Sequence, residues 1–112
     1  MLEKLASLEA RYNELTEEIA KPEVIADQTT WQKLMKAHAD LEPVVETYRA
    51  YKAALEAVDE AKGILEEEKD AELRELAQRQ LDAHREEAAN LERQLKSLLL
   101  PEAPIDDKIV SL

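Results

Sequence analysis

The chain has 112 residues, a formal net charge of −11 and no cysteine, and 45% of its residues are hydrophobic. The length suits one domain, and the absence of cysteine excludes disulfides, thiolate catalysis and cysteine-ligated zinc. One glycine in a sequence rich in Ala, Leu, Glu, Lys, Arg and Gln is typical of long helices, because these residues lose little side-chain freedom in a helix. We therefore predict an all-α fold.

The composition also limits where the protein acts and what it binds. The N-terminal stretch MLEKLASLEARY lacks the apolar run of a signal peptide, and no other segment is apolar enough to span a bilayer. We expect a cytoplasmic protein with no membrane partner. Its negative charge makes nucleic acid a poor direct partner, because like charges repel, whereas a basic protein surface is a better match.

The first predicted helix carries two apolar series with a spacing of seven residues, which places both on one face. These series are Met1, Leu8, Leu15 and Leu5, Tyr12, Ile19. We expect this helix to end at Lys21, because the ring of Pro22 cannot continue the hydrogen-bond ladder. The stretch KPEVIADQTT is then the connector to the second helix.

The second predicted helix begins at Thr29, which has the capping-box spacing to Gln32. Its apolar pattern crosses Pro43 without losing phase, which indicates a kink within one long helix rather than a loop between two. Asp40 and Glu42 leave open the alternative that a new helix starts near this proline.

The third predicted helix follows the charged stretch EEEKDAE, with the second helix ending near Glu67 and the third capped by Asp70. Its end is predicted at Pro101, and Leu73 and Leu76 are expected to extend its apolar pattern into the first turns. Two series repeat every seven residues: Leu81, Ala88, Leu95 and Ala77, His84, Leu91, Leu98.

These elements predict an elongated antiparallel three-helix bundle or coiled coil. The first helix is too short to cover the other two, so we expect it beside the first half of the second helix, with helices 2 and 3 forming a protruding two-helix arm. The expected seam of this arm contains Lys62, Arg74, Ala77 and Gln80 and is only weakly apolar. We expect a helical domain over 1–100 and an extended tail over 101–112 that leads to a following domain.

The end of the chain, LKSLLLPEAPIDDKIVSL, differs from the charged helical sequence before it. Leu98, Leu99 and Leu100 span nearly a full helical turn, so we expect Leu99 or Leu100 to be partly exposed. The alternating residues after Pro101 suit a strand, but a lone strand has no ladder to join. We therefore expect no sheet within the chain there.

Candidate chemical residues are few. His38 and His84 have no nearby ligand set, so we expect them to border the packing stripe and to form ordinary hydrogen bonds, with no metal or cofactor site. The glutamates at 66–68 and 86–87 are interpreted as solvated helix faces rather than catalytic pairs.

One enzyme hypothesis comes from the stretch LASLEARYNELTEEI, which resembles a helical chorismate mutase subunit. That chemistry needs several Arg and Lys side chains in one cavity to hold a dicarboxylate. Arg11 borders the stripe and Lys62 lies in the arm, but the other basic residues mostly occupy outward positions. We therefore predict no catalytic residues and no enzyme activity.

Three segments taken together carry a more specific resemblance: MLEKLASLEARYNELTEEIAKPEVIAD, LEPVVETYRAYK and LLLPEAPIDDK. Their order and spacing resemble the N-terminal domain of the bacterial peptide chain release factor 1 family, the class I translation termination factors. The resemblance covers essentially the whole chain.

The resemblance implies a role in translation termination and a longer protein. In that family a Pro-x-Thr tripeptide reads the stop codon and a Gly-Gly-Gln loop promotes peptidyl-tRNA hydrolysis; neither occurs in these 112 residues. The implied partners are the ribosome, at the large-subunit stalk base near ribosomal protein L11, and the remaining release-factor domains. The contacting face stays unassigned, and a generic acidic coiled-coil adaptor with fortuitous similarity is the alternative.

Overall fold

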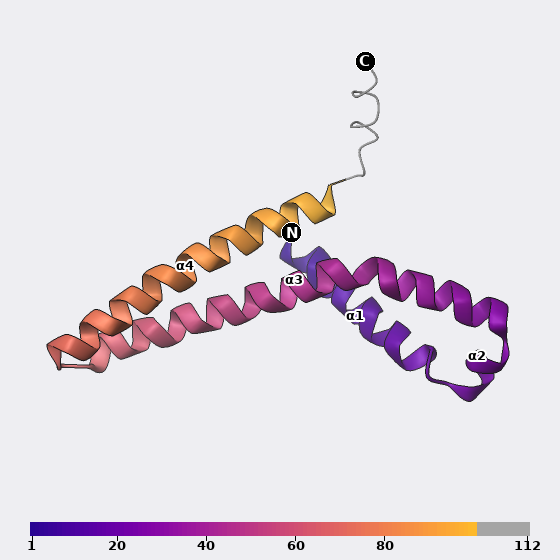
Figure 1. Ribbon diagram of the computed structural model, residues 1–112, viewed down its shortest axis with the longest axis horizontal. Helices are drawn as coiled ribbons and strands as arrows, with labels where there is room; N and C mark the ends of the chain where they lie inside the picture. The colour runs from indigo at the N-terminus through magenta and orange to yellow at the C-terminus, as the bar shows by residue number, and fades with distance from the viewer. Residues whose placement is uncertain (101–112) are drawn as a thin grey trace, which may run out of the picture. The chain divides into compact units, whose positions relative to one another are not determined.

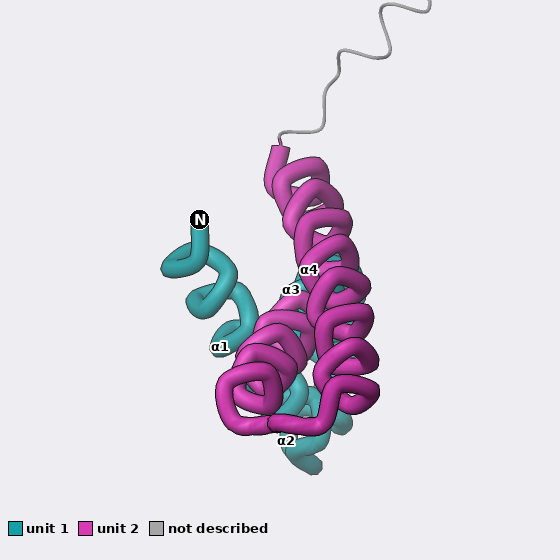
Figure 2. The backbone as a smooth tube through the Cα atoms, turned by 90° about the vertical axis from the view of Figure 1, so that its left-hand side faces the viewer, with its two compact units in different colours: residues 1–49 teal, residues 50–112 magenta. Residues whose placement is uncertain are grey.

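The computed structural model describes residues 1–100, and every element within that range is a helix (Figure 1). The helices are α1 (Leu2–Glu18), α2 (Pro22–Ala26), α3 (Gln28–Glu67) and α4 (Ala71–Leu99). The all-α prediction is confirmed, with one short helix more than expected. The chain forms two compact units, residues 1–49 and the residues from 50 onward, and α3 contributes to both (Figure 2).

The additional helix, α2, lies in the segment that was predicted to connect the first and second helices. α1 ends at Glu18, earlier than the predicted Lys21, and the N–H of Ala20 donates to the carbonyl of Glu17 at 3.3 Å. Pro22 then starts α2. A proline suits the first helical position because the N–H that it lacks would have no partner within the helix.

The start of α3 differs from the predicted capping box at Thr29. The helix begins at Gln28, and the carboxylate of Asp27 accepts hydrogen bonds from the N–H of Thr30 at 3.3 Å and from its hydroxyl at 2.8 Å. The prediction was wrong because Asp is a stronger capping residue than Thr and stands two residues earlier.

This cap should make the stability of the domain depend on pH. Hydrogen bonds from Thr30 hold the pKa of Asp27 below the ordinary value of 3.8; the bond from the Thr30 hydroxyl has the larger effect and the bond from its N–H the smaller. Because the pKa of Asp27 is lower in the folded than in the unfolded state, the ionised carboxylate stabilises the fold at pH values above the unfolded-state pKa. This stabilisation is lost as the pH falls through the folded-state pKa. Asp27→Asn keeps a capping side chain that does not titrate. We expect its melting temperature to fall less than that of the parent chain between pH 7 and about pH 3, and equal falls would contradict this role of Asp27.

Pro43 lies inside α3, which continues through it as a single helix. The predicted continuity is confirmed, and the alternative of a new helix near Asp40 or Glu42 is wrong. A proline inside a helix costs about 3 kcal/mol through the lost hydrogen bond and the crowding of its ring. Val44 and Val45 follow it directly and are both buried, so their packing offsets this cost.

In the first unit, α1 runs antiparallel to the first half of α3, as predicted. Arg49 donates to Glu9 in the middle of α1 at 2.7 Å, and the indole N–H of Trp31, near the start of α3, donates to the carbonyl of Ile19 just after α1 at 3.3 Å. The later contact on α1 therefore pairs with the earlier residue of α3, as in an antiparallel pair. The buried residues of this unit are Leu5, Leu15, Val44, Val45 and Tyr48.

In the second unit, the second half of α3 and α4 form an antiparallel hairpin (Figure 2). α3 ends at Glu67 as predicted, and Asp70 caps α4 as predicted. One carboxylate oxygen of Asp70 accepts from the N–H groups of Glu72 at 2.9 Å and Leu73 at 3.4 Å. Two donors that lack partners within the helix are thereby satisfied.

The interior of this hairpin is more apolar than the predicted seam. Its buried cluster consists of Val58, Ala61 and Leu81, with Leu65 packed against it, and Ala77 is also buried. Lys62, Arg74 and Gln80 are instead exposed, so their placement in the seam was wrong. Arg74 donates to the carbonyls of Leu65 and Glu68 near the end of α3, which have no partners further along that helix.

The two heptad series of α4 have different burial. Leu81, Ala88 and Leu95 are all buried. In the other series only Ala77 is buried, while His84 and Leu91 are half-buried and Leu98 is exposed. Leu100 is 68% exposed, which confirms that the three leucines at the end of α4 cannot all be covered. The predictions for the tail after Pro101, including the absence of a sheet, lie outside the described residues.

Candidate interaction surface

An apolar strip is exposed where the α3–α4 hairpin turns. We define the hairpin-end strip as Ile64, Leu73 and Leu76, which are 45%, 48% and 46% exposed. A cavity of about 240 Å³ is lined by these three residues together with Glu68, Ala77 and Gln80. Both helices and the turn between them therefore contribute to one surface.

The sequence prediction had assigned Leu73 and Leu76 to the packing pattern of the third helix. The structure leaves both about half exposed, because Ala77 and Leu81 occupy the positions of α4 that face α3. A seven-residue spacing identifies an apolar face but does not say which of two adjacent apolar rows is covered. The strip was missed for this reason.

The surroundings of the strip are acidic. Residues 59–80 contain eight acidic and four basic side chains, a net charge of −4. This segment is about a fifth of the chain and carries more than a third of its net charge of −11. An exposed apolar patch with a polar rim is typical of a surface that contacts another protein.

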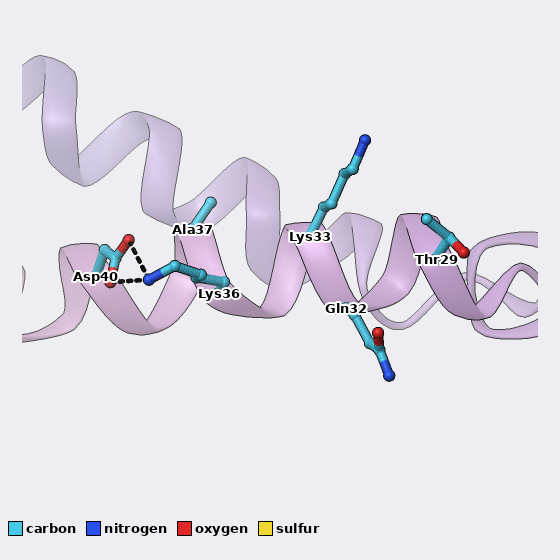
Figure 3. Close-up of a pocket in the computed structure, with 6 residues that line it drawn as sticks. All are labelled: Thr29, Gln32, Lys33, Lys36, Ala37 and Asp40. Atoms are coloured by element: carbon cyan, nitrogen blue, oxygen red, sulfur yellow. Dashed lines mark hydrogen bonds and ion pairs between the residues drawn. The ribbon is translucent and has the colours of Figure 1, made fainter.

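A second, larger hollow of about 550 Å³ lies along the start of α3 (Figure 3). It is lined by Thr29, Gln32, Lys33, Lys36, Ala37 and Asp40, all from one helix. Lys36 and Asp40 pair at 3.5 Å, while Gln32 and Lys33 point to different sides of the helix (Figure 3). An exposed pair of this kind contributes at most about 0.5 kcal/mol, and the hollow gathers no convergent set of polar groups.

His38 takes part in a contact between α1 and α3. Its ring stacks on Tyr12, with ring centres 4.1 Å apart, and its Nε2 lies 2.9 Å from the hydroxyl of Thr16. That hydroxyl donates its only hydrogen to the carbonyl of Tyr12, so it accepts from an Nε2–H of His38. His38 therefore joins two helices.

The remaining candidates are surface residues with local partners. His84 is half-buried and lies 3.3 Å from Glu87 one turn later, in accord with the expected ordinary hydrogen bond. Glu66, Glu67, Glu86 and Glu87 are exposed, in accord with solvated faces, whereas Glu68 is half-buried and lines the cavity at the hairpin end.

The two basic residues of the enzyme hypothesis are also exposed. Arg11 pairs with Glu14 at 3.3 Å, and Lys62 lies on the surface of α3.

Within residues 1–100, no group of three His, Cys, Asp or Glu side chains is arranged to hold a metal ion. Among the helices that the structure describes, none is long and apolar enough to cross a membrane.

Comparison with known proteins identifies the family. The model of the PCRF domain matches residues 8–112, nearly the whole sequence. The chain therefore belongs to the PCRF domain family.

Relatives that carry the name peptide chain release factor 1 match this chain over nearly its whole length. The protein from Clostridioides difficile strain 630 is 54% identical over 110 residues, which cover 98% of this chain and 31% of the relative. Those from Clostridium botulinum strain Hall and Alkaliphilus metalliredigens are 50% and 46% identical, with the same coverage. The predicted resemblance to release factor 1 is confirmed. The chain spans about a third of the length of these relatives, and no solved structure matches it significantly.

Proposed function

We propose that this chain is a non-catalytic domain of a translation termination factor, and that it helps the whole protein to engage the ribosome during stop-codon-dependent peptide release. The observation that carries the proposal is the 54% identity to a release factor 1 across 98% of the chain, together with membership of the PCRF domain family. Similarity of this extent also argues against the alternative hypothesis of a generic coiled-coil adaptor, because that hypothesis required the resemblance to have arisen by chance.

The proposed partner on the ribosome is the large-subunit stalk base, in the region of ribosomal protein L11, and the other partners are the remaining domains of the factor. The net charge of −11 supports a basic protein surface rather than bare RNA as the direct contact. The proposed location is the cytoplasm, where ribosomes translate.

The proposal predicts that the 112-residue chain releases no peptide. Its single glycine, Gly63, excludes a Gly-Gly-Gln element in these residues, and no Pro-x-Thr tripeptide occurs among them. We expect no hydrolysis of peptidyl-tRNA on ribosomes with a stop codon in the decoding site. The measurement is release of a labelled peptide, with a full-length release factor 1 as positive control; release that requires a stop codon would contradict the non-catalytic role.

Binding of the chain to ribosomes is predicted to be weak and sensitive to salt. Attraction between an acidic domain and a basic protein is screened by ions, so we expect affinity to fall about ten-fold between about 0.05 and 0.3 M KCl. Co-sedimentation of the labelled chain with ribosomes measures this, with a non-ionic osmolyte of equal osmolality as control. Affinity that does not change with salt would indicate an apolar contact instead.

A further inference from the structure

The hairpin-end strip has the spacing of a helix-binding groove. On α4, Leu73, Leu76, Ala77 and Gln80 lie three, four and seven residues apart, so they form one continuous row, and Ile64 on α3 forms the other side of the cavity. The volume of about 240 Å³ is below the roughly 300–1,000 Å³ of ordinary small-molecule sites. The cavity therefore suits a side chain of a protein partner better than a cofactor.

The rim of the strip specifies the charge of that partner. Glu60 and Glu67 lie four residues before and three residues after Ile64, so they share its face of α3, and both are exposed. On α4, Glu72 lies one turn before Leu76 and Arg79 about one turn after it. Together with Glu68, which lines the cavity, four carboxylates and one guanidinium leave a negative border around an apolar floor.

From this placement we propose that the hairpin-end strip binds a basic amphipathic helix of another protein, with one large apolar side chain inserted into the cavity between α3 and α4. The apolar row of such a helix would cover the three aliphatic residues of the strip, and its basic flanks would face Glu60, Glu67 and Glu72. This is the arrangement by which helices are bound in grooves, with anchors at a spacing of three and four residues.

The same charges argue against a second copy of this chain as the occupant. Two strips facing each other would bring two segments of net charge −4 together, and like charges across an interface are unfavourable. Interior packing does not need the strip either, because Val58, Ala61 and Leu81 form the buried cluster of the hairpin. The strip can therefore be altered without removing the core.

The test uses the 112-residue chain and three synthetic helical peptides of about 18 residues, a length of roughly five turns. The first contains Lys with Leu at a spacing of three and four, the second replaces every Lys by Glu, and the third replaces every Leu by Gln. The strip variant is Leu73→Gln with Leu76→Gln. The control is Leu55→Gln, because Leu55 is 40% exposed in the same unit and lies two and a half turns from Ile64, on the other side of α3.

We expect the Lys/Leu peptide to bind the parent chain and the Leu55→Gln variant equally, and the strip variant about ten-fold more weakly, a difference of about 1.4 kcal/mol. The other two peptides should bind at least about ten-fold more weakly than the first. Two double variants distinguish the effect of the rim carboxylates from the effect of net charge, because both remove two negative charges. Glu60→Gln with Glu67→Gln should weaken binding more than Glu86→Gln with Glu87→Gln.

Three results would overturn the inference: no binding of the Lys/Leu peptide, equal loss in the strip and Leu55→Gln variants, or a dimer of the chain in sedimentation that dissociates in the strip variant. Circular dichroism of each variant verifies that the helices are retained. The inference goes beyond the ribosome proposal, because peptide binding is measured without ribosomes and either result can fail while the other holds.

Discussion

Leu95→Ala is expected to lower the free energy of unfolding by about 2–5 kcal/mol, the range for a buried leucine replaced by alanine. Leu95 has no exposed surface, so the shorter side chain leaves a cavity that its neighbours fill only in part. Urea unfolding followed by circular dichroism measures the change. Folded domains are commonly stable by only about 5–15 kcal/mol, so the loss is a large fraction of the total.

Two leucines of the same helix are matched controls for this change. Leu91 is half-buried and Leu98 is 45% exposed, so the same substitution removes less buried surface at both positions. We expect Leu91→Ala to cost less than Leu95→Ala, and Leu98→Ala less again. If Leu91→Ala had the larger effect, the burial of the two heptad series would be the reverse of that described.

Leu81→Asp is expected to unfold the α3–α4 hairpin at ordinary temperature. Leu81 is 4% exposed and contacts the cluster of Val58 and Ala61, so an aspartate there would place a carboxylate in an apolar interior without a partner. Such a change costs more than about 4 kcal/mol, because both the packing and the hydration of the charge are lost.

Leu76→Asp is the control for Leu81→Asp. It introduces the same residue in the same helix at a position that is 46% exposed. We expect it to retain the helical circular dichroism signal and a cooperative melt, whereas Leu81→Asp should lose a large part of both. Similar melts for the two variants would show that the interior of the hairpin does not lie at Leu81.

Much of the fold follows from local sequence rules. The seven-residue spacing predicted the buried row of Leu81, Ala88 and Leu95, and Asp70 was predicted as the cap of α4. These rules work because the spacing of apolar side chains and the unpaired N–H groups of a first turn act within a few residues. The continuity of α3 through Pro43 followed from the same reasoning, since the apolar pattern keeps its phase there.

Other features depend on competition between neighbouring signals. Asp27 and Thr29 are both capping residues, and the sequence pattern did not reveal that Asp27 would bind both donors of Thr30. Pro22 was interpreted as the end of one helix, although a proline equally suits the start of another. In both cases two local signals lay within a few residues of each other, and the spacing alone did not rank them, although Asp is the stronger capping residue.

The hairpin-end strip was not predictable from spacing. Leu73 and Leu76 continue an apolar pattern in α4, and only the packing of Ala77 and Leu81 leaves them exposed. The signal that the sequence did contain was the charged stretch EEEKDAE directly before two leucines. Exposed apolar residues with acidic neighbours near a turn are typical of a surface that contacts another protein.

We propose that this chain engages the ribosome without performing the release reaction. Co-sedimentation of the labelled 112-residue chain with ribosomes that contain or lack protein L11 tests this at low salt, where screened attraction is strongest. We predict saturable binding to complete ribosomes and a loss of most of it when L11 is absent. Equal binding to both kinds of ribosome would contradict the proposed contact at the stalk base, and no binding to either would contradict ribosome engagement by this domain.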